Sequence, residues 1–228
     1  MWPVMTKCLV LCLLLPTLAG ASLGGAASRS PPISTNLIKI GLIVDEPNPG
    51  FVETGADQAK SCAGVSFTRN LKYGESDLNV LDVAVGDPEG TFPRPVLLFV
   101  TGDGFAGQGD MAGPLGNQAA CFAAHNGMIG VKMAYRQAPA NPWLPAAQDI
   151  AAALSWIHQN IDLFGGNREE IAADGYSTGA FHVASLLAHP EFGTQDSGFA
   201  GAVLVSGIYR SSIEAGATEK AYLDDDAS

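Results

Sequence analysis

Two kinds of hydrophobic pattern distinguish the first strands that the sequence predicts. Residues 65–73 and 78–85 alternate apolar and polar side chains around the polar stretch 73–77, which predicts two strands joined by a turn. Residues 95–100 are apolar without alternation, as expected of a strand buried on both faces of a sheet, and residues 129–134 form a shorter, similar stretch. We therefore expect a sheet that begins antiparallel and continues with buried strands.

The later elements alternate between helix and strand. Apolar side chains from Ile150 to Phe164 recur at intervals of three and four residues, which predicts one buried stripe on a helix that ends at Gly165. A short strand at 171–174, a helix at 178–189 and an apolar strand at 201–206 follow. Strands that alternate with helices require right-handed crossovers, so we predict an α/β fold of three layers with a mainly parallel sheet.

Composition narrows the classes of partner. The chain has 228 residues, of which 47% are hydrophobic, and a formal net charge of -11. This acidity argues against nucleic acid or anionic membranes as partners, because both select for clustered Lys and Arg. The run Asp224-Asp225-Asp226 is typical of a solvated loop. No Cys and His cluster has zinc spacing, and the sequence does not indicate an oligomeric state.

The N-terminus has the pattern of an export signal. Lys7 precedes the apolar run 8–15, and Ala19-Gly20-Ala21 offers a cleavage site between small residues. The apolar run is too short for a transmembrane helix, which needs about 20 residues. We expect a signal peptide at residues 1–21, no stable membrane anchor after cleavage, and a secreted or periplasmic protein.

The rest of the chain divides into an N-terminal arm and one domain. Residues 22–62 are rich in Ser, Gly, Ala and Pro, and their apolar stretch 37–44 fits either an edge strand or an extended arm. Residues 63–228 contain no internal repeat and no linker to a second domain. Outside the signal the cysteines are Cys62 and Cys121, which can pair in an oxidising compartment or remain two buried thiols.

Two glycine-rich loops follow predicted strands, at the sheet edge where open α/β proteins collect reactive groups. Gly175-Tyr176-Ser177-Thr178-Gly179 has the Gly-x-Ser-x-Gly pattern of a tight turn that exposes a serine hydroxyl. Thr101-Gly102-Asp103-Gly104-Phe105 offers close backbone approach and N–H groups for an oxyanion. Either loop could be a turn without a ligand, but the position of Ser177 between strand and helix favours a nucleophile.

Four segments in order resemble the His-Gly-Gly-Gly group of carboxylesterases and lipases with the α/β-hydrolase fold, including its feruloyl-esterase-like members. The loop at 101–105 is similar to the oxyanion loop of this group, and the turn at 175–179 to its nucleophile elbow. Between them two further stretches resemble family motifs. These are Tyr135-Arg136-Gln137-Ala138-Pro139, which Pro142-Trp143, Pro145-Ala146-Ala147 and Asp149 follow at the spacing of the family, and Phe164-Gly165-Gly166-Asn167.

The resemblance implies an ester hydrolase that acts on small-molecule carboxylic esters without a metal or organic cofactor. Ser177 would attack the ester, a His would serve as base and then acid, and an Asp or Glu would orient the His. The resemblance also implies an oxyanion hole made by the backbone N–H groups of Asp103, Gly104 and Thr178. Thr101, Gly102 and Phe105 would support the oxyanion loop, and Gly175, Tyr176 and Gly179 would form the nucleophile elbow around Ser177. Arg136 and Asp149 would form a structural pair.

The family places its acid and its His after the nucleophile, but the sequence from Ser177 to Ser228 has room for only one helix, one strand and a loop. We therefore expect an incomplete record whose last strands are missing, which is inactive by itself and leaves the strand at 201–206 as an exposed apolar edge. We expect exposed or helix-capping roles for the four histidines, His125, His158, His182 and His189.

Three residues depart from the family pattern. Thr101 replaces a His, Asp103 replaces a Gly, and Asp174 precedes the elbow where a neutral residue is expected. A buried, unpaired Asp174 would destabilise the fold or have a shifted pKa. Together with the missing acid and His, these departures leave open a non-catalytic binding protein on the same scaffold. An aminopeptidase or amidase of the same fold is a further alternative, because it shares every motif present in this sequence.

Overall fold

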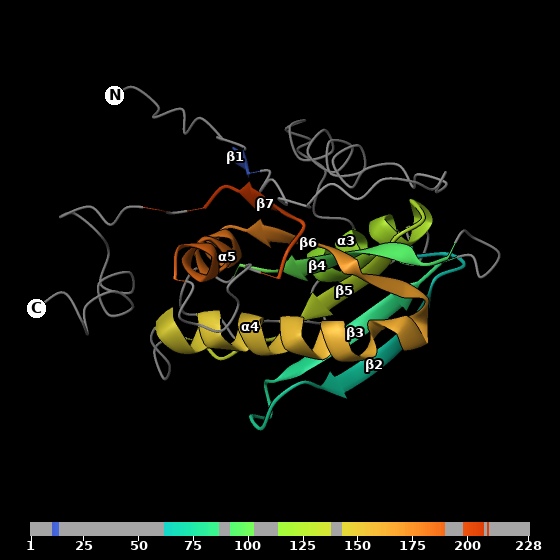
Figure 1. Cartoon of the computed structure of the whole chain (residues 1–228), viewed down its shortest axis with the longest axis horizontal. Helices are drawn as coiled ribbons and strands as arrows, with labels where there is room; N and C mark the ends of the chain where they lie inside the picture. The colour runs from blue at the N-terminus through green and yellow to red at the C-terminus, as the bar shows by residue number, and fades with distance from the viewer. Residues whose placement is uncertain are drawn as a thin grey trace, which may run out of the picture.

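A mixed sheet of seven strands, with helices on both of its faces, forms the fold (Figure 1). The computed structural model describes residues 11–13, 62–86, 92–102, 114–137, 143–189, 198–207 and 209. No helix in these ranges is long and apolar enough to cross a membrane. The predicted arm stretch at 37–44 and the acidic run at 224–226 lie outside the described residues.

The strand order in the sheet is β1-β7-β6-β4-β5-β3-β2. The bounds are β1 Leu11–Leu13, β2 Ser66–Lys72, β3 Val80–Val85, β4 Arg94–Val100, β5 Ile129–Met133, β6 Gly166–Tyr176 and β7 Gly201–Val205. The pairs β2–β3 and β3–β5 are antiparallel, whereas β5–β4, β4–β6 and β6–β7 are parallel. The predicted sheet, antiparallel at first and then mainly parallel, is confirmed.

The helices divide between the two faces of the sheet. Their bounds are α3 Pro114–His125, α4 Trp143–Asn160 and α5 Thr178–Ala188, with a 3₁₀ turn η1 at Ile161–Phe164. Alternate residues of β4 face opposite layers, because side chains alternate along a strand. Val96 and Leu98 join the core cluster of α4 and α5, and Leu97 packs in the cluster that includes Ala123 of α3. The predicted three-layer architecture is thereby confirmed.

The stripe predicted from Ile150 onward is buried. Ile150, Leu154, Ile157 and Ile161 have no exposed surface. The helix tightens into η1 for its last turn and ends where Gly165 adopts a φ of 76°, a left-handed conformation that favours glycine. The end predicted at Gly165 is therefore correct, although the last turn is 3₁₀ rather than α.

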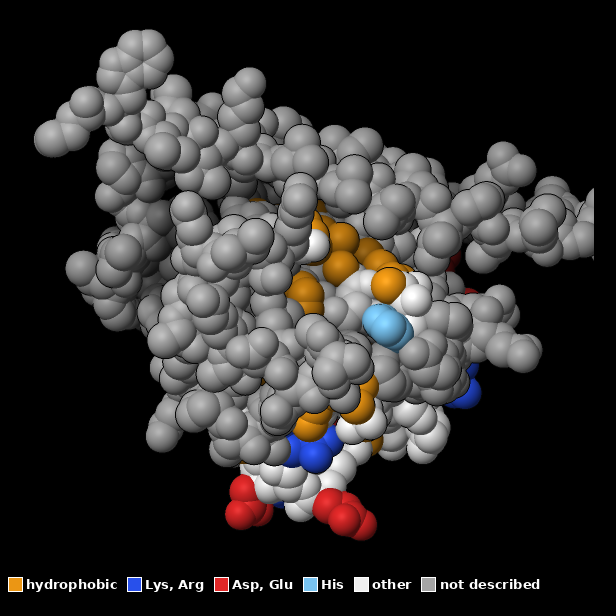
Figure 2. All heavy atoms as spheres, turned by 90° about the vertical axis from the view of Figure 1, so that its left-hand side faces the viewer, with side chains coloured by type: hydrophobic (Ala, Val, Ile, Leu, Met, Phe, Trp, Pro, Cys, Tyr) orange, Lys and Arg blue, Asp and Glu red, His pale blue; other side chains and the backbone are white. Residues whose placement is uncertain are grey.

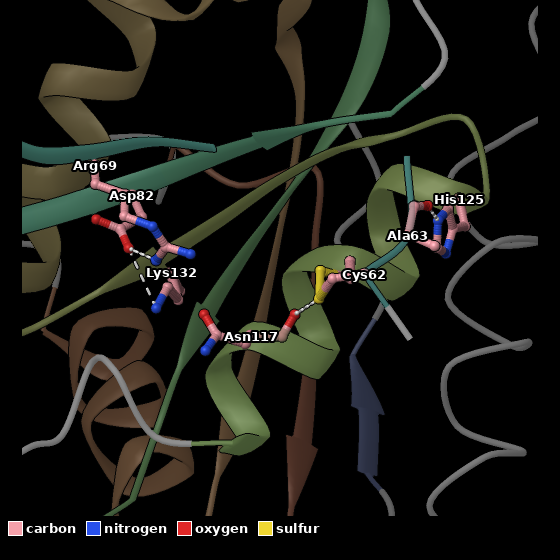
Figure 3. The surroundings of a disulfide bond; sticks show 8 residues. Cys62, Ala63, Arg69, Asp82, Asn117, His125 and Lys132 are labelled. Atoms are coloured by element: carbon pink, nitrogen blue, oxygen red, sulfur yellow. Dashed lines mark hydrogen bonds and ion pairs between the residues drawn. A yellow bond between two sulfur atoms is a disulfide. The ribbon is translucent and has the colours of Figure 1, made fainter. Parts of the chain in front are cut away.

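Helix α3 packs very closely on strands β3 and β5 and is tied to residue 62. A Cβ on Gly86 would lie 2.4 Å from the Ala124 carbonyl oxygen, and one on Gly130 would lie 2.2 Å from that of Ala120. A disulfide joins Cys121 of α3 to Cys62, across 59 residues of sequence (Figure 3). Of the two states left open by the sequence, the structure has the paired one, and closing a loop of this length stabilises a fold by about 4 kcal/mol in the chain-entropy model.

The prediction that the strand at 201–206 is an exposed edge is wrong. Residues Leu11–Leu13 form β1, which pairs antiparallel with β7 through Cys12 and Val203. An apolar strand with an open row of N–H and C=O groups is a strong template for another strand, and the apolar run near the N-terminus supplies one. Because β1 lies inside the signal peptide that we expect to be removed, cleavage would return β7 to the edge.

Candidate active site

The two predicted reactive loops meet at the carboxyl edge of the parallel strands, toward which β4 and β6 point in Figure 1. Thr101 and Gly102 follow β4, and Ser177 follows β6. The backbone N–H of Ser177 donates a hydrogen bond to the Val205 carbonyl at 2.8 Å, so the end of β7 also borders the site. Asp103, Gly104 and Phe105 of the first loop lie outside the described residues.

Ser177 has the strained backbone of a nucleophile elbow. Its φ of 55° and ψ of -121° lie in a region that residues other than glycine rarely occupy, and it caps the N-terminus of α5. Its glycine neighbours cannot be replaced without displacing backbone. A Cβ on Gly175 would lie 2.6 Å from the Ala180 Cα, and one on Gly179 would lie 2.1 Å from the Val100 oxygen. The local geometry is thus the one that the Gly-x-Ser-x-Gly pattern predicts.

Gly102 lies directly against this elbow. A Cβ on Gly102 would be 2.5 Å from the Tyr176 carbonyl oxygen, 2.6 Å from the Ser177 Cβ and 2.9 Å from the Thr178 nitrogen. Thr178 is the first residue of α5, and N–H groups there point along the positive end of the helix dipole. The structure therefore brings the start of the glycine loop and the expected Thr178 donor together beside the nucleophile.

Asp174 is buried on β6, three residues before Ser177. It is 5% exposed and lies in register between Phe99 of β4 and Val203 of β7. Its Oδ1 has no hydrogen-bond partner. Burial raises the pKa of Asp174 to about 7, so the carboxyl is neutral in mildly acidic solution. The predicted shift of a buried, unpaired aspartate is confirmed.

The sequence of the described core matches a known family. A model of the carboxylesterase family matches residues 65–225. The chain belongs to the carboxylesterase family. Among curated relatives of this carboxylesterase chain, esterase LipC of Mycobacterium tuberculosis is 34% identical over 118 residues, which are 52% of this chain and 28% of LipC. Phenmedipham hydrolase of Pseudarthrobacter oxydans is 35% identical over 107 residues, which are 42% of this chain and 20% of that protein.

Solved esterases share the fold of this carboxylesterase chain. Esterase B from Lactobacillus rhamnosis superimposes with a TM-score of 0.52 at 18% identity, covering 71% of this chain and 54% of that one. Carboxylesterase EST55 from Geobacillus stearothermophilus gives a TM-score of 0.50 at 21% identity, covering 60% and 38%. The chain thus spans about half of esterase B and less than a third of LipC.

His182 is buried in this carboxylesterase chain, so the predicted exposed or capping role is wrong. The residue is 2% exposed, because α5 is packed between α4 and the sheet. Its ring lies edge-on to the ring of Tyr135, with 5.1 Å between centroids, and contacts Phe181. Burial lowers the pKa of His182 to about 3, which keeps the imidazole neutral. His182 is a core residue rather than a base for Ser177.

The other three histidines are engaged away from Ser177. His125 is exposed, as predicted, with its Nε2 2.9 Å from the Ala63 carbonyl oxygen. His158 is half-buried and its Nε2 lies 3.1 Å from the Gly198 carbonyl oxygen, so neither predicted role fits it. His189 is the C-cap residue of α5, about 18 Å along the helix from Ser177. The chain therefore offers no histidine that is placed as a base.

The predicted structural pair, Arg136 and Asp149, is confirmed. The Arg136 Nη2 donates to Asp149 Oδ1 at 2.7 Å, Nε donates to both carboxylate oxygens, and the Arg136 backbone N–H donates to Oδ2 at 2.8 Å. This set of bonds raises the pKa of Arg136, led by the hydrogen bond to Asp149. The pair fixes the segment after β5 to α4.

The described side chains at the carboxyl edge are of mixed kind. Figure 2 looks onto this edge and shows hydrophobic side chains near the middle of the face, next to a histidine and other atoms, with most of the visible acidic side chains at its margins. Within the described residues, no three His, Cys, Asp or Glu side chains are grouped so that they could hold a metal ion.

The role of Tyr135 is not evident from the sequence. There it is only part of a family motif, yet in the structure its buried hydroxyl donates to the Thr101 carbonyl oxygen at 2.7 Å. Such a bond joins residues 34 positions apart, so no local pattern reveals it. The available signal is a tyrosine just after a mainly apolar strand, where a buried hydroxyl needs a partner.

Proposed function

We propose that this protein hydrolyses carboxylic esters through an acyl-enzyme at Ser177. In the first step the Ser177 oxygen attacks the ester carbonyl, and the alcohol leaves with the proton that Ser177 gives up to a base. In the second step water attacks the acyl carbonyl, the bond to the Ser177 oxygen breaks, the carboxylic acid leaves, and the serine oxygen regains a proton from the base. The observation that carries this proposal is the strained φ of 55° at Ser177, in a turn against which Gly102 is packed.

The negative charge that develops on the carbonyl oxygen requires donors that are fixed in advance. We assign this role to the backbone N–H of Thr178 and to those of Asp103 and Gly104, which follow Gly102 in the chain. The position of Thr178 at the N-terminus of α5 supports the assignment, because the helix dipole favours an anion there. Loss of one such donor typically costs about 3 to 4 kcal/mol of transition-state stabilisation.

The base and its orienting acid are proposed to come from sequence beyond Ser228. Two observations support this placement. The nucleophile precedes the acid and the His in α/β-hydrolases, and the histidines of this chain are buried in the core or engaged elsewhere. None of the four histidines, all of which lie in the described residues, is placed to take the proton of the Ser177 hydroxyl, so we propose that residues 1–228 alone give little turnover.

The substrate class and the compartment are also proposals. We propose small-molecule carboxylic esters as substrates, on the family resemblance to His-Gly-Gly-Gly carboxylesterases and feruloyl-esterase-like proteins, and the hydrophobic side chains visible near the middle of the face in Figure 2 are compatible with uncharged ones. The disulfide between Cys62 and Cys121 supports export through the signal at residues 1–21, because disulfides persist in oxidising compartments.

The direct test is hydrolysis of 4-nitrophenyl esters of increasing acyl length by the protein expressed from its complete gene. Replacing Ser177→Ala removes the nucleophile, and we expect kcat to fall by at least about 1,000-fold. Ser185→Ala is the matched control, since Ser185 lies on the same helix and its hydroxyl bonds only to the helix, at the Phe181 carbonyl. Equal rates for wild type and Ser177→Ala would overturn the proposal.

A non-catalytic binding protein is the second candidate, and one observation favours it. A buried, unpartnered Asp174 directly behind the elbow is unfavourable for a strand that must hold a nucleophile. A fluorophosphonate probe separates the candidates, because only an activated serine reacts with it. An amidase or aminopeptidase shares the same motifs and is distinguished by faster turnover of 4-nitroanilides than of the matching esters.

A further inference from the structure

A buried tyrosine hydroxyl connects the segment after β5 to the start of the glycine loop. Tyr135 is 1% exposed, and its hydroxyl donates to the carbonyl oxygen of Thr101 at 2.7 Å. Thr101 is the first residue after β4 and directly precedes Gly102. The hydrogen bond therefore acts at the point where the chain leaves the sheet and enters the loop.

The same carbonyl is confined by the nucleophile elbow. A Cβ on Gly179 would lie 2.8 Å from the Thr101 carbonyl oxygen, and a Cβ on Gly102 would lie 2.6 Å from the Ser177 Cβ. The peptide between Thr101 and Gly102 is thus enclosed by the elbow, and its carbonyl is held by Tyr135. A small rotation of this peptide would change its contacts with both.

Because the peptide is planar, this hydrogen bond also constrains the orientation of the N–H of the next residue. In a planar trans peptide, the carbonyl and the following N–H point in opposite directions. Holding the Thr101 carbonyl on Tyr135 therefore fixes the orientation of the Gly102 N–H. In the sequence Gly102 directly precedes Asp103 and Gly104, the oxyanion donors of the proposed mechanism.

Tyr135 is itself held in place by its neighbours. The His182 ring packs edge-on at 5.1 Å between centroids, and the adjacent Arg136 is bonded through its backbone N–H and its guanidinium to Asp149. Burial keeps the His182 imidazole neutral, so its packing brings no charge next to the phenol. A side chain fixed on its ring and along its backbone presents its hydroxyl in one place.

We propose that Tyr135 is a positioning residue for the oxyanion loop, acting through the Thr101 carbonyl. This inference rests on the proposed esterase function of Ser177. Because the oxyanion exists only in the transition state and the intermediate, loss of the positioning bond lowers kcat and leaves KM nearly unchanged. A purely structural hydroxyl would instead affect stability without this split.

The test compares two phenol-to-carbonyl hydrogen bonds in the protein expressed from its complete gene. Tyr135→Phe removes the bond to Thr101 and keeps the ring that packs on His182. Tyr73→Phe is the matched control, because the Tyr73 hydroxyl donates to the neighbouring carbonyl, that of Ala134. We expect Tyr135→Phe to lower kcat for 4-nitrophenyl acetate by about 10- to 100-fold, with KM within about twofold, as for other small misplacements of catalytic groups.

Two further readouts complete the test. The rate of fluorophosphonate labelling of Ser177 should fall by a similar factor in Tyr135→Phe, because the phosphonylation step uses the same donors. Tyr73→Phe should retain the wild-type kcat and labelling rate, while thermal unfolding reports any loss of stability in both variants. Unchanged kcat in Tyr135→Phe, or an equal loss of kcat in Tyr73→Phe, would overturn the positioning role. A wild type no faster than Ser177→Ala would instead overturn the proposed function itself.

Discussion

Two buried aspartates of the sheet have opposite surroundings. Asp82 of β3 is 2% exposed and lies 3.2 Å from the Lys132 Nζ and 2.8 Å from the Arg69 Nη1 (Figure 3). It also accepts the backbone N–H of Asn70 at 2.9 Å. Asp174 of β6 is almost as deeply buried, yet its Oδ1 has no partner. The antiparallel side of the sheet thus compensates its buried carboxylate, and the strand that carries the nucleophile does not.

The difference shows where this fold tolerates unfavourable features. A buried charge is normally paired, and a buried polar atom normally has a hydrogen-bond partner. Both the unpartnered Asp174 and the strained backbone of Ser177 lie within three residues of each other at the end of β6. Such exceptions cluster at functional sites, where the surrounding structure holds them in place.

We expect the largest loss of stability when the paired carboxylate of Asp82 is removed. Asp82→Ala leaves Lys132, which is 1% exposed, as a buried cation without its carboxylate. Removing one partner of a buried ion pair typically destabilises a protein by about 3 to 5 kcal/mol, and we expect a loss of this size. Urea denaturation at pH 7 measures it. A loss below about 1 kcal/mol would show that water solvates the Lys132 ammonium once the carboxylate is gone.

A second prediction concerns the uncompensated site and its dependence on pH. The pKa of Asp174 is raised from 3.8 to about 7, so the folded chain keeps a proton that the unfolded chain has released. Its contribution to the free energy of unfolding is full below about pH 4 and is lost as the pH rises to 7. The shift corresponds to about 4 kcal/mol. Relative to wild type, Asp174→Asn should gain up to this amount between pH 4 and 8.

The comparison must be made between variant and wild type, because His182 has the opposite dependence. Its pKa is lowered from 6.5 to about 3, so its contribution to stability is present above pH 6.5 and is lost as the pH falls toward 3. In the wild type the two slopes oppose each other between about pH 4 and 6.5. A difference between Asp174→Asn and wild type that is constant from pH 4 to 8 would mean that Asp174 is ionised throughout.

We expect the smallest change in the free energy of unfolding from breaking an exposed ion pair, which serves as a reference for the two buried aspartates. Arg168 and Asp162 form a salt bridge whose side chains are 46% and 49% exposed. Exposed pairs contribute about 0 to 1 kcal/mol, because solvent screens them and both side chains lose freedom. Arg168→Ala should therefore change the free energy of unfolding by less than about 1 kcal/mol, and the change should shrink in 1 M salt. A loss as large as that of Asp82→Ala would contradict this ranking.

The sequence predicted the elements whose patterns are local. The alternation in β2, the unbroken apolar run of β4 and the stripe that includes Ile150 each follow from the face that the residues bury. The predicted range of β6, residues 171–174, is shorter than the observed strand, Gly166–Tyr176. The prediction excluded Arg168 and Glu169 because they are polar, and both are exposed although the strand already pairs with β4 at Gly166. A strand whose pairing partner lies far away in sequence can continue through polar residues.

Features that depend on distant partners could not be predicted. β1 pairs with Val203 across most of the chain, and His182 is buried because α5 is enclosed by α4 and the sheet. The same holds for the hydrogen bond from Tyr135 to Thr101. At the site, the elbow around Ser177 was predictable because its glycines are required locally. The sequence pattern does not predict the bounds of helix α3, because its alanines and Gly116 form no clear apolar stripe.

Covalent labelling is the most direct test of whether Ser177 is a nucleophile. The protein expressed from its complete gene is treated with a fluorophosphonate, digested and examined by mass spectrometry to locate the phosphonylated residue. We expect one adduct per chain, on Ser177, which is lost in Ser177→Ala and retained in Ser185→Ala. An adduct on another residue, or equal labelling of Ser177→Ala and wild type, would contradict it.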